Sequence, residues 1–285
     1  MVRGSGAAFK RARPKRRGDR PRATIALFCG TLRAGLSRLP SSRSASLVLS
    51  LRNAYEALAV SAPTVVDAAR GRLRAEDCDE RLERFAAHVV QNADIRVDVR
   101  GRDHLDGSLH GDRRRAFVVM SNHQSHYDVP VLYHVLGGNM RMVAKKELFG
   151  LPLFGRAIRD AGMIEVDRGN RERAIASLQI AKEKLAAGTN IWIAPEGTRS
   201  PTGELLSFKK GGFVLALDME APVLPITIQG TRAVLPAKGM RSRRGVEVEV
   251  TIHPVIETAE IAKLEKKAAR DTLMTEVRRA IASAL

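Results

Sequence analysis

Two histidines, a serine and an aspartate lie close together in the stretch SNHQSHYD at residues 121–128. His123 and Asp128 are five positions apart, a spacing that puts two side chains on different faces of a continuous helix. They can meet only if His123 lies in a loop and Asp128 lies in the first turn of the helix that follows. An aspartate so placed accepts the N–H of one imidazole nitrogen and leaves the other nitrogen to take a proton from a substrate hydroxyl.

The same stretch also has structural interpretations. Asp128 or Ser125 can cap the N-terminus of the helix, since both residue types are preferred there. Ser125 is a candidate nucleophile beside a histidine and an aspartate, although it lacks the glycine-flanked turn that exposes the serine of a hydrolase. The pattern alone leaves the catalytic and the capping interpretations open.

The flanking sequence predicts that the cluster is a loop between a strand and a helix. The apolar run AFVVM ends at Met120, and VPVLYHVL at 129–136 predicts a helix with Pro130 near its first turn and two glycines behind it. Proteins of the α/β class commonly build their sites in such loops.

Three further segments place charged side chains at the ends of expected elements. IAPEGTRS at 193–200 follows the buried run NIWIA, GMIEVDRG at 162–169 contains another short strand, and SFKKGG at 207–212 precedes a helix. The residues so placed are Glu196, Gly197, Thr198 and Arg199, Asp167 and Arg168, and Lys209 and Lys210. Glycine permits close backbone approach, and the arginine fork matches phosphate oxygens. Singly these residues are turn ion pairs or surface charges, but together they predict a cationic pocket beside a histidine base.

From residue 95 onward, short strands alternate with helices, a pattern that predicts an α/β fold. IRVDVRG alternates with period two, and PVLPITI predicts a core strand with a proline at its edge. A helix is predicted between Asn170 as its N-cap and Gly188, with an apolar face formed by Ile175, Leu178, Ala181 and Leu185. A last amphipathic helix is predicted at 260–285, carrying Leu264, Leu273, Val277 and Ile281.

Residues 23 to about 90 predict two short helices, with breaks at Pro40 and Pro63. These helices suit either a membrane interface or packing on the main domain. No stretch reaches the run of about 18 apolar residues that a membrane-spanning helix needs. The two cysteines, Cys29 and Cys78, match no metal-ligand or redox spacing, so we assign them no role and expect no metal site.

The formal net charge is +17, from 48 basic and 31 acidic residues. Residues 1–22 contain nine Lys/Arg against Asp19 alone, which predicts a disordered polybasic arm. Its expected partner is anionic, either an acidic membrane surface or nucleic acid, and a merely solvated tail is the alternative. An aromatic content of only 4% and the lack of any nucleic-acid motif argue against nucleic acid.

Four blocks of this sequence resemble the 1-acylglycerol-3-phosphate O-acyltransferase family, also called lysophosphatidic acid acyltransferases. The blocks are NHQSHYD, GMIEVDR, PEGTRS with FKKGGF, and APVLPI, in the order and approximate spacing of the motifs of that family. The blocks are shared with glycerol-3-phosphate and other lysolipid acyltransferases. The resemblance implies a glycerol-3-phosphate acyltransferase-like mixed sheet flanked by helices, with an N-terminal helical segment. The expected divisions are the arm (1–22), a helical, interfacial segment (23–94), the acyltransferase domain (95–256) and the C-terminal amphipathic helix (257–285).

The resemblance also implies roles for the residues at matching positions. His123 is expected to be the general base and Asp128 its orienting partner. The acceptor-phosphate site is expected to comprise Glu196, Gly197, Thr198 and Arg199, helped by Arg168 and Lys209, and Pro225 belongs to the acyl-donor block. The sequence departs from the family pattern at Ala194, where the family often has phenylalanine, and the N-terminal hydrophobic anchor of many members is missing or shortened.

The implied reaction moves a fatty acyl group from a thioester donor, acyl-CoA or acyl carrier protein, to the free hydroxyl of 1-acylglycerol-3-phosphate, giving phosphatidic acid. No cofactor or metal is implied, and no acyl-enzyme is needed. The expected location is peripheral or monotopic, at the cytoplasmic face of an anionic membrane. The alternatives are an acyltransferase for another lysolipid or for glycerol-3-phosphate, and a noncatalytic lipid-binding protein.

Overall fold

The structure is a computed structural model that describes residues 42–105, 115–167 and 169–285. The predicted arm at 1–22, the expected break at Pro40, Cys29 and Arg168 all lie outside the described residues. Within the described ranges, none of the helices combines the length and the apolar character that crossing a membrane requires.

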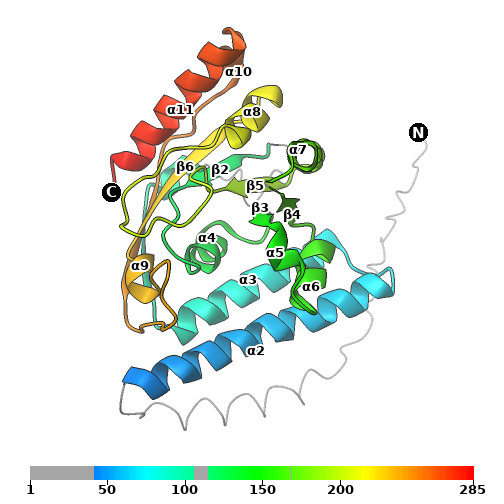
Figure 1. The fold of residues 1–285 in the computed structure, drawn as a ribbon, viewed down its shortest axis with the longest axis vertical. Helices are drawn as coiled ribbons and strands as arrows, with labels where there is room; N and C mark the ends of the chain where they lie inside the picture. The colour runs from blue at the N-terminus through cyan, green and yellow to red at the C-terminus, as the bar shows by residue number, and fades with distance from the viewer. Residues whose placement is uncertain (1–41, 106–114, 168) are drawn as a thin grey trace, which may run out of the picture. The chain divides into compact units, whose positions relative to one another are not determined.

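A seven-stranded sheet lies at the centre of the described chain, in the order β1-β7-β6-β2-β5-β3-β4 (Figure 1). Neighbouring strands are parallel except β6 and β7, so the sheet is mixed, as predicted. The strands are β1 (Arg96–Arg100), β2 (Val118–Ser121), β3 (Met140–Lys145), β4 (Ile164–Val166), β5 (Asn190–Ile193), β6 (Val223–Gln229) and β7 (Glu247–Ile252). Because β6, β2, β5, β3 and β4 all run in one direction, the loops that follow them meet at one edge of the sheet.

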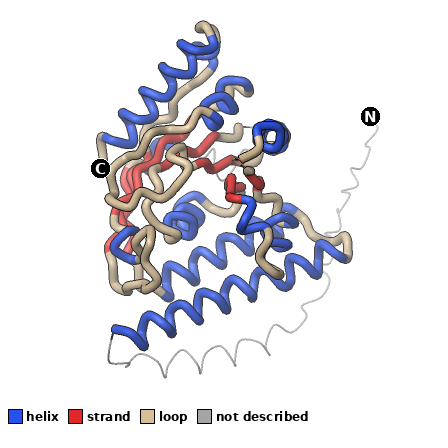
Figure 2. Tube along the Cα trace, in the orientation of Figure 1, coloured by secondary structure: helices blue, strands red, loops and turns tan. Residues whose placement is uncertain are grey.

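Helices cover both faces of the sheet (Figure 2). One layer contains α2 (Ser42–Ala69), α3 (Ala75–Asn92) and α4 (Asp128–Leu136), and the other contains α7 (Arg171–Ala186), α8 (Gly211–Asp218) and α11 (Lys266–Ala282). The short helices are α5 (Lys146–Phe149), α6 (Phe154–Asp160), α9 (Thr231–Val234), α10 (Ala259–Ala262) and the 3-10 helix η1 (Arg102–Leu105).

The strand β2 shows why its run of apolar residues is continuous. Val119 packs into the core between the sheet and α3 and α4, whereas Val118 and Met120 pack into the core with α8 and α11. Successive side chains of a strand point to opposite faces, so a strand covered on both faces must be apolar at every position.

The predicted helix between Asn170 and Gly188 is present as α7. The Asn170 side chain accepts a backbone N–H of the first turn at 3.0 Å, which confirms the predicted N-cap. Of the predicted apolar face, Ala181 and Leu185 are buried, but the Ile175 side chain is 58% exposed. The buried stripe of α7 is therefore narrower than the sequence indicated.

The C-terminal segment forms two helices, so the prediction of one helix over 260–285 is wrong. Leu264 lies between α10 and α11 and is 49% exposed. Leu273, Val277 and Ile281 of α11 are fully buried against the sheet and α8. The prediction was correct in placing these three residues on the apolar face of a helix.

The predicted break at Pro63 is also wrong, because α2 is a single helix of 28 residues with Pro63 inside it. Proline removes one helical N–H donor and crowds the preceding turn. The Thr64 hydroxyl donates to the Val60 carbonyl at 2.7 Å and accepts from Arg81 of α3 at 3.2 Å. Arg81 also forms an ion pair with Asp67, so contacts with α3 tie down the helix on the C-terminal side of the proline.

Replacing Pro63 by alanine should stabilise the protein. Alanine restores the N–H and removes the ring, and an interior proline costs about 3 kcal/mol relative to alanine, so we expect a gain of about 1 to 3 kcal/mol in the free energy of unfolding, measured by urea denaturation. Pro63→Gly is the matched control, since it restores the N–H but has a lower helix propensity and should fall below the alanine variant. A Pro63→Ala variant no more stable than the native protein would contradict this account.

Candidate active site

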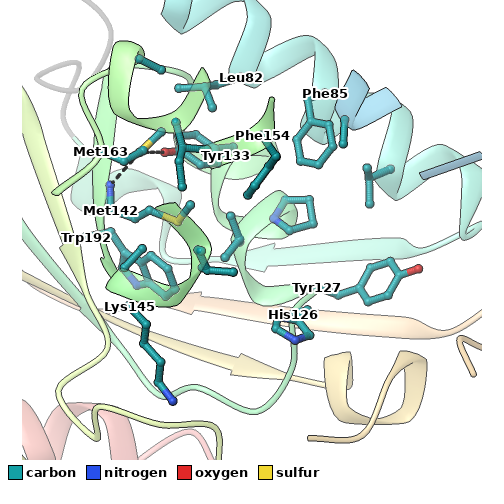
Figure 3. Close-up of a pocket in the computed structure, with 18 of the residues that line it drawn as sticks. Leu82, Phe85, His126, Tyr127, Tyr133, Met142, Lys145, Phe154, Met163 and Trp192 are labelled. Atoms are coloured by element: carbon teal, nitrogen blue, oxygen red, sulfur yellow. Dashed lines mark hydrogen bonds between the residues drawn. The ribbon is translucent and has the colours of Figure 1, made fainter. Parts of the chain in front are cut away.

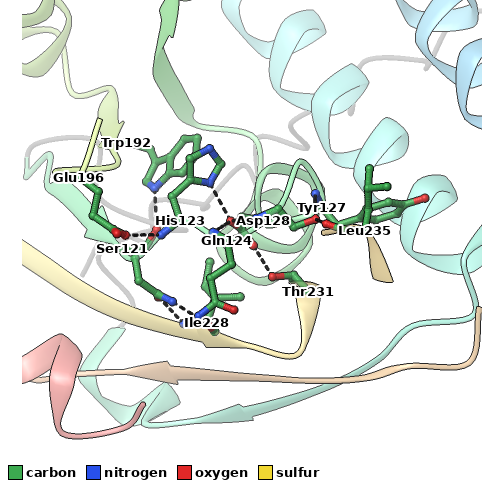
Figure 4. Close-up of polar contacts among 12 residues, drawn as sticks. Ser121, His123, Gln124, Tyr127, Asp128, Trp192, Glu196, Ile228, Thr231 and Leu235 are labelled. Carbon is green, nitrogen blue, oxygen red and sulfur yellow. Dashed lines mark hydrogen bonds and ion pairs between the residues drawn. The ribbon is translucent and has the colours of Figure 1, made fainter. Parts of the chain in front are cut away.

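His123 and Asp128 meet as their spacing predicted. His123 lies in the loop after β2, Asp128 is the first residue of α4, and imidazole Nδ1 lies 2.7 Å from Asp128 Oδ2 (Figure 4). Because an ionised carboxylate can only accept hydrogen bonds, Nδ1 carries the proton in this pair and Nε2 keeps its lone pair. The imidazole is thereby oriented to accept a proton through Nε2.

The Asp128 carboxylate is fully buried and orders the loop that carries His123. Its Oδ2 also accepts the backbone N–H groups of Gln124 at 2.7 Å and Ser125 at 2.9 Å, and its Oδ1 accepts the hydroxyl of Thr231. Both backbone donors precede α4, so the carboxylate folds the loop back toward the helix. The N-cap position itself is Tyr127, whose side chain makes no capping bond.

Ser125 has a structural task in the same loop. Its hydroxyl donates to the Leu235 carbonyl at 2.8 Å and accepts the Tyr127 N–H at 3.2 Å. The residue is fully buried. These contacts commit the hydroxyl proton to a carbonyl, and they give no support to the interpretation of Ser125 as a nucleophile.

The backbone of His123 is held by the loop that follows β5. Its N–H donates to Glu196 Oε1 at 2.8 Å, its carbonyl accepts the Ser200 N–H at 2.7 Å, and its ring meets the edge of Trp192 with centroids 5.7 Å apart. The second carboxylate oxygen of Glu196 accepts the Leu206 N–H at 2.9 Å. Burial raises the pKa of the Glu196 carboxyl, and the two backbone donors oppose that shift.

A cavity of about 730 Å³ lies beside the imidazole (Figure 3). Helices α2, α3, α4 and α6 and the ends of β3 and β5 contribute its walls, together with His123. The large apolar side chains on its wall include Leu82, Phe85, Tyr133, Phe154, Met163 and Trp192. A largely apolar cavity of this size beside a few polar groups is typical of a small-molecule site.

The predicted anion-binding residues are partly brought together at this cavity. Gly197, Thr198 and Arg199 line it beside His123, and Gly197 has a φ of 72° that favours glycine. His126 lines the cavity as well, and its pKa is lowered by burial and by the nearby charges of Arg199 and His123. A second imidazole and a guanidinium therefore line the same cavity as the His123 ring.

The other predicted site residues have different surroundings. Glu196 lies behind the cavity wall with both oxygens bound to backbone N–H groups, so the contacts seen for it are positioning contacts. The Lys209 side chain is exposed, and the backbone N–H of Lys209 donates to the Pro195 carbonyl at 2.7 Å. Pro225 is buried within β6, opposite Met120, where its carbonyl accepts the His253 N–H at 3.0 Å. The roles expected for these residues stay predictions.

The sequence analysis did not predict several contacts that build the site. Thr231, which binds Asp128, follows β6, and its place at the carboxyl end of a parallel strand was an available signal. Asn122 uses its side-chain amide to bind both the N–H and the carbonyl of Ile228, at 2.7 and 2.8 Å. The contribution of α2 and α3 to the cavity had no local signal, because it depends on where these helices pack.

Residues 96–229 match the family model described as Acyltransferase. Residues 96–229 are therefore similar to an acyltransferase domain. The resemblance drawn from the four motif blocks is confirmed.

Relatives of the same kind are found among animal, plant and bacterial proteins. The chain is 33% identical to the human 1-acyl-sn-glycerol-3-phosphate acyltransferase alpha over 178 residues, which are 62% of this chain and 60% of that protein. It is 32% identical to the chloroplastic 1-acyl-sn-glycerol-3-phosphate acyltransferase BAT2 of Brassica napus over 161 residues, 56% of this chain and 45% of that protein. The chain thus spans 60% or less of the length of these two relatives.

The fold also has a solved counterpart. The crystal structure of the 1-acyl-sn-glycerophosphate acyltransferase PlsC from Thermotoga maritima superposes with a TM-score of 0.67 and 26% sequence identity, covering 86% of this chain and 98% of that chain. The predicted acyltransferase-like mixed sheet flanked by helices is confirmed.

Asp128→Asn and His123→Ala should each lower, by at least about 10²-fold, the turnover of a reaction that uses His123 as its base, since a positioned base contributes about 10² to 10⁴ in rate. Asparagine keeps the shape but turns one acceptor oxygen into a donor, so the imidazole tautomer is no longer fixed. His134→Ala is the control, because it removes an exposed histidine of the same helix α4, and its rate should stay within about twofold of the native rate. Activity of Asp128→Asn close to that of the native protein, at equal thermal stability, would show that the pair is structural.

Proposed function

We propose that the protein transfers a fatty acyl group from a thioester donor, acyl-CoA or acyl carrier protein, to the free hydroxyl of 1-acylglycerol-3-phosphate. The product is phosphatidic acid. The observation that carries this proposal is the placement of the His123–Asp128 pair and of Arg199 at the wall of one apolar cavity. The printed names of the relatives support the choice of acceptor.

The reaction needs a base, an anion-binding site and an apolar cavity that holds an acyl chain away from water. His123 Nε2 takes the proton of the acceptor hydroxyl, and the resulting oxygen nucleophile attacks the thioester carbonyl. The tetrahedral intermediate expels the thiolate, which receives the proton back from the imidazolium. The Asp128 carboxylate stabilises that imidazolium because it is held 2.7 Å from Nδ1 and is shielded from water.

The cavity binds the acyl chain of the acceptor, and the loop after β5 binds its phosphate. Burial of each methylene of an acyl chain contributes about 0.8 kcal/mol, so the apolar wall supplies affinity without orienting charge. The Arg199 guanidinium presents a planar fork to the phosphate beside His123. Ala194 also lines the cavity, and a side chain this small leaves room where a phenylalanine would fill it.

A panel of acceptors tests the proposed function. The purified protein is assayed for thiol release with 1-acylglycerol-3-phosphate, with the same monoacylglycerol lacking the phosphate, and with glycerol-3-phosphate lacking the chain. We expect a clear preference for the acceptor that has both groups. Equal rates with and without the phosphate would overturn the assigned acceptor, and binding of the lipid with no thiol release would show a noncatalytic lipid-binding protein.

Arg199→Lys should weaken the binding of the acceptor more than that of the donor. Lysine keeps the charge but loses the bidentate fork, and we expect a rise of about tenfold in the KM for the acceptor with less than about twofold change in the KM for the donor. Initial rates with one substrate varied at a time measure both constants. A larger effect on the donor would mean that Arg199 belongs to the donor site.

We further propose that the protein works on an anionic membrane surface at its cytoplasmic face. Helix α2 lines the cavity with one face and presents an apolar stripe to the outside on another. The stripe consists of Leu47, Leu51, Tyr55 and Leu58, with exposures between 53% and 63%. Its spacing follows one side of a helix, as in helices that lie in a membrane interface. The basic arm at 1–22 supplies a charge that attracts anionic lipid.

Sedimentation with vesicles separates these two contributions. The double substitution Leu51→Asp, Leu58→Asp should weaken binding at high salt, whereas deletion of residues 1–22 should weaken binding to anionic vesicles only at low salt, because salt screens charge and leaves apolar burial intact. Ile175→Asp on α7 is the matched control, since Ile175 is equally exposed but lies outside the stripe. A stripe variant that binds like this control would remove α2 from the membrane contact.

A further inference from the structure

The C-terminal helix α11 lies outside the matched acyltransferase domain, yet one of its side chains contacts the loop that follows β5. The Arg278 guanidinium donates from Nη1 to the Leu206 carbonyl at 2.8 Å and from Nη2 to the Leu205 carbonyl at 3.2 Å. Its Cζ atom lies 5.2 Å from the centroid of the Phe208 ring. A planar fork on two successive carbonyls, together with an aromatic face, fixes both the position and the orientation of this segment.

The same loop segment is bound to the catalytic histidine from its other side. The Leu206 N–H donates to Glu196 Oε2 at 2.9 Å, and Glu196 Oε1 accepts the His123 N–H at 2.8 Å. Three consecutive contacts therefore lead from Arg278 through Leu206 and Glu196 to the backbone of His123. The buried carboxylate of Glu196 can hold His123 in place only while Leu206 presents its N–H at the right point.

The base of this loop is also held by contacts in which Arg278 takes no part. The Lys209 N–H donates to the Pro195 carbonyl at 2.7 Å, and the Phe208 ring stacks on the buried Phe213 ring with centroids 5.9 Å apart. Loss of Arg278 therefore leaves the base of the loop closed and releases mainly residues 205 and 206. This separates a local effect on the site from a general loss of the fold.

We propose that Arg278 is a positioning residue for the acyltransferase reaction, acting through Leu206 and Glu196 on the backbone of His123. The proposal rests on the proposed function for the role of His123 as the base, whereas the chain of contacts itself does not depend on which lipid is bound. The C-terminal helix thus supports the position of His123 through the loop after β5, although none of the described residues of α11 lines the cavity.

Arg278→Ala should lower kcat by about tenfold, because a small displacement of a catalytic group has a large effect on rate. Arg278→Lys keeps the charge but lacks the fork, so it should recover only part of the loss. Arg279→Ala is the matched control, an exposed arginine one position further along the same helix, and its kcat should equal that of the native protein. All rates are measured with the acceptor that the native protein uses best, so a wrong acceptor assignment leaves this comparison intact.

Two further measurements distinguish positioning from mere stabilisation of α11. Hydrogen exchange of residues 203–207 should be about tenfold faster in Arg278→Ala and unchanged in Arg279→Ala, and this readout needs no activity. The double variant Arg278→Ala, Glu196→Gln should have a kcat close to that of Glu196→Gln alone, since both changes break one path. Additive losses in the double variant, or a native kcat in a folded Arg278→Ala variant, would overturn the proposal.

Discussion

The arrangement of the site depends on one buried carboxylate. Asp128 has no exposure to solvent, and an ionised group in such a place is costly unless donors surround it. Its donors come from His123, from two backbone N–H groups of the loop after β2, and from Thr231 after β6. A loop and a strand end that are distant in sequence must therefore meet at one point, and the parallel pairing of β2 with β6 brings them there.

A second buried carboxylate completes the support of His123. Asp128 fixes the orientation of the imidazole ring, and Glu196 fixes the position of the His123 backbone. Both acids face into the protein, and the positive side chain of Arg199 lines the cavity. The acidic side chains thus hold the histidine, and in the proposed reaction Arg199 is the group that meets the phosphate of the acceptor.

The sequence revealed the parts of this structure that depend on local rules. The five-residue spacing of His123 and Asp128, with a proline two positions later, indicated the one geometry in which the two side chains can meet, and Asn170 was recognised as a cap by its residue type. Pro63 was misjudged because contacts of Thr64, Asp67 and Arg81 with one another bridge α2 and α3. The direction of the Glu196 side chain and the cavity wall from α2 and α3 depend on long-range packing, which a motif does not encode.

Part of the cavity wall comes from a different stretch of chain than the chemistry beside it. The His123 loop and the loop after β5 lie within residues 96–229, whereas α2 and α3 precede them. A substitution on an inward-facing position of α2 or α3 changes the shape of the cavity without touching the contacts that hold the imidazole. In evolutionary terms, an enzyme with the proposed activity and this arrangement is free to drift between acyl chains of different length without passing through inactive intermediates.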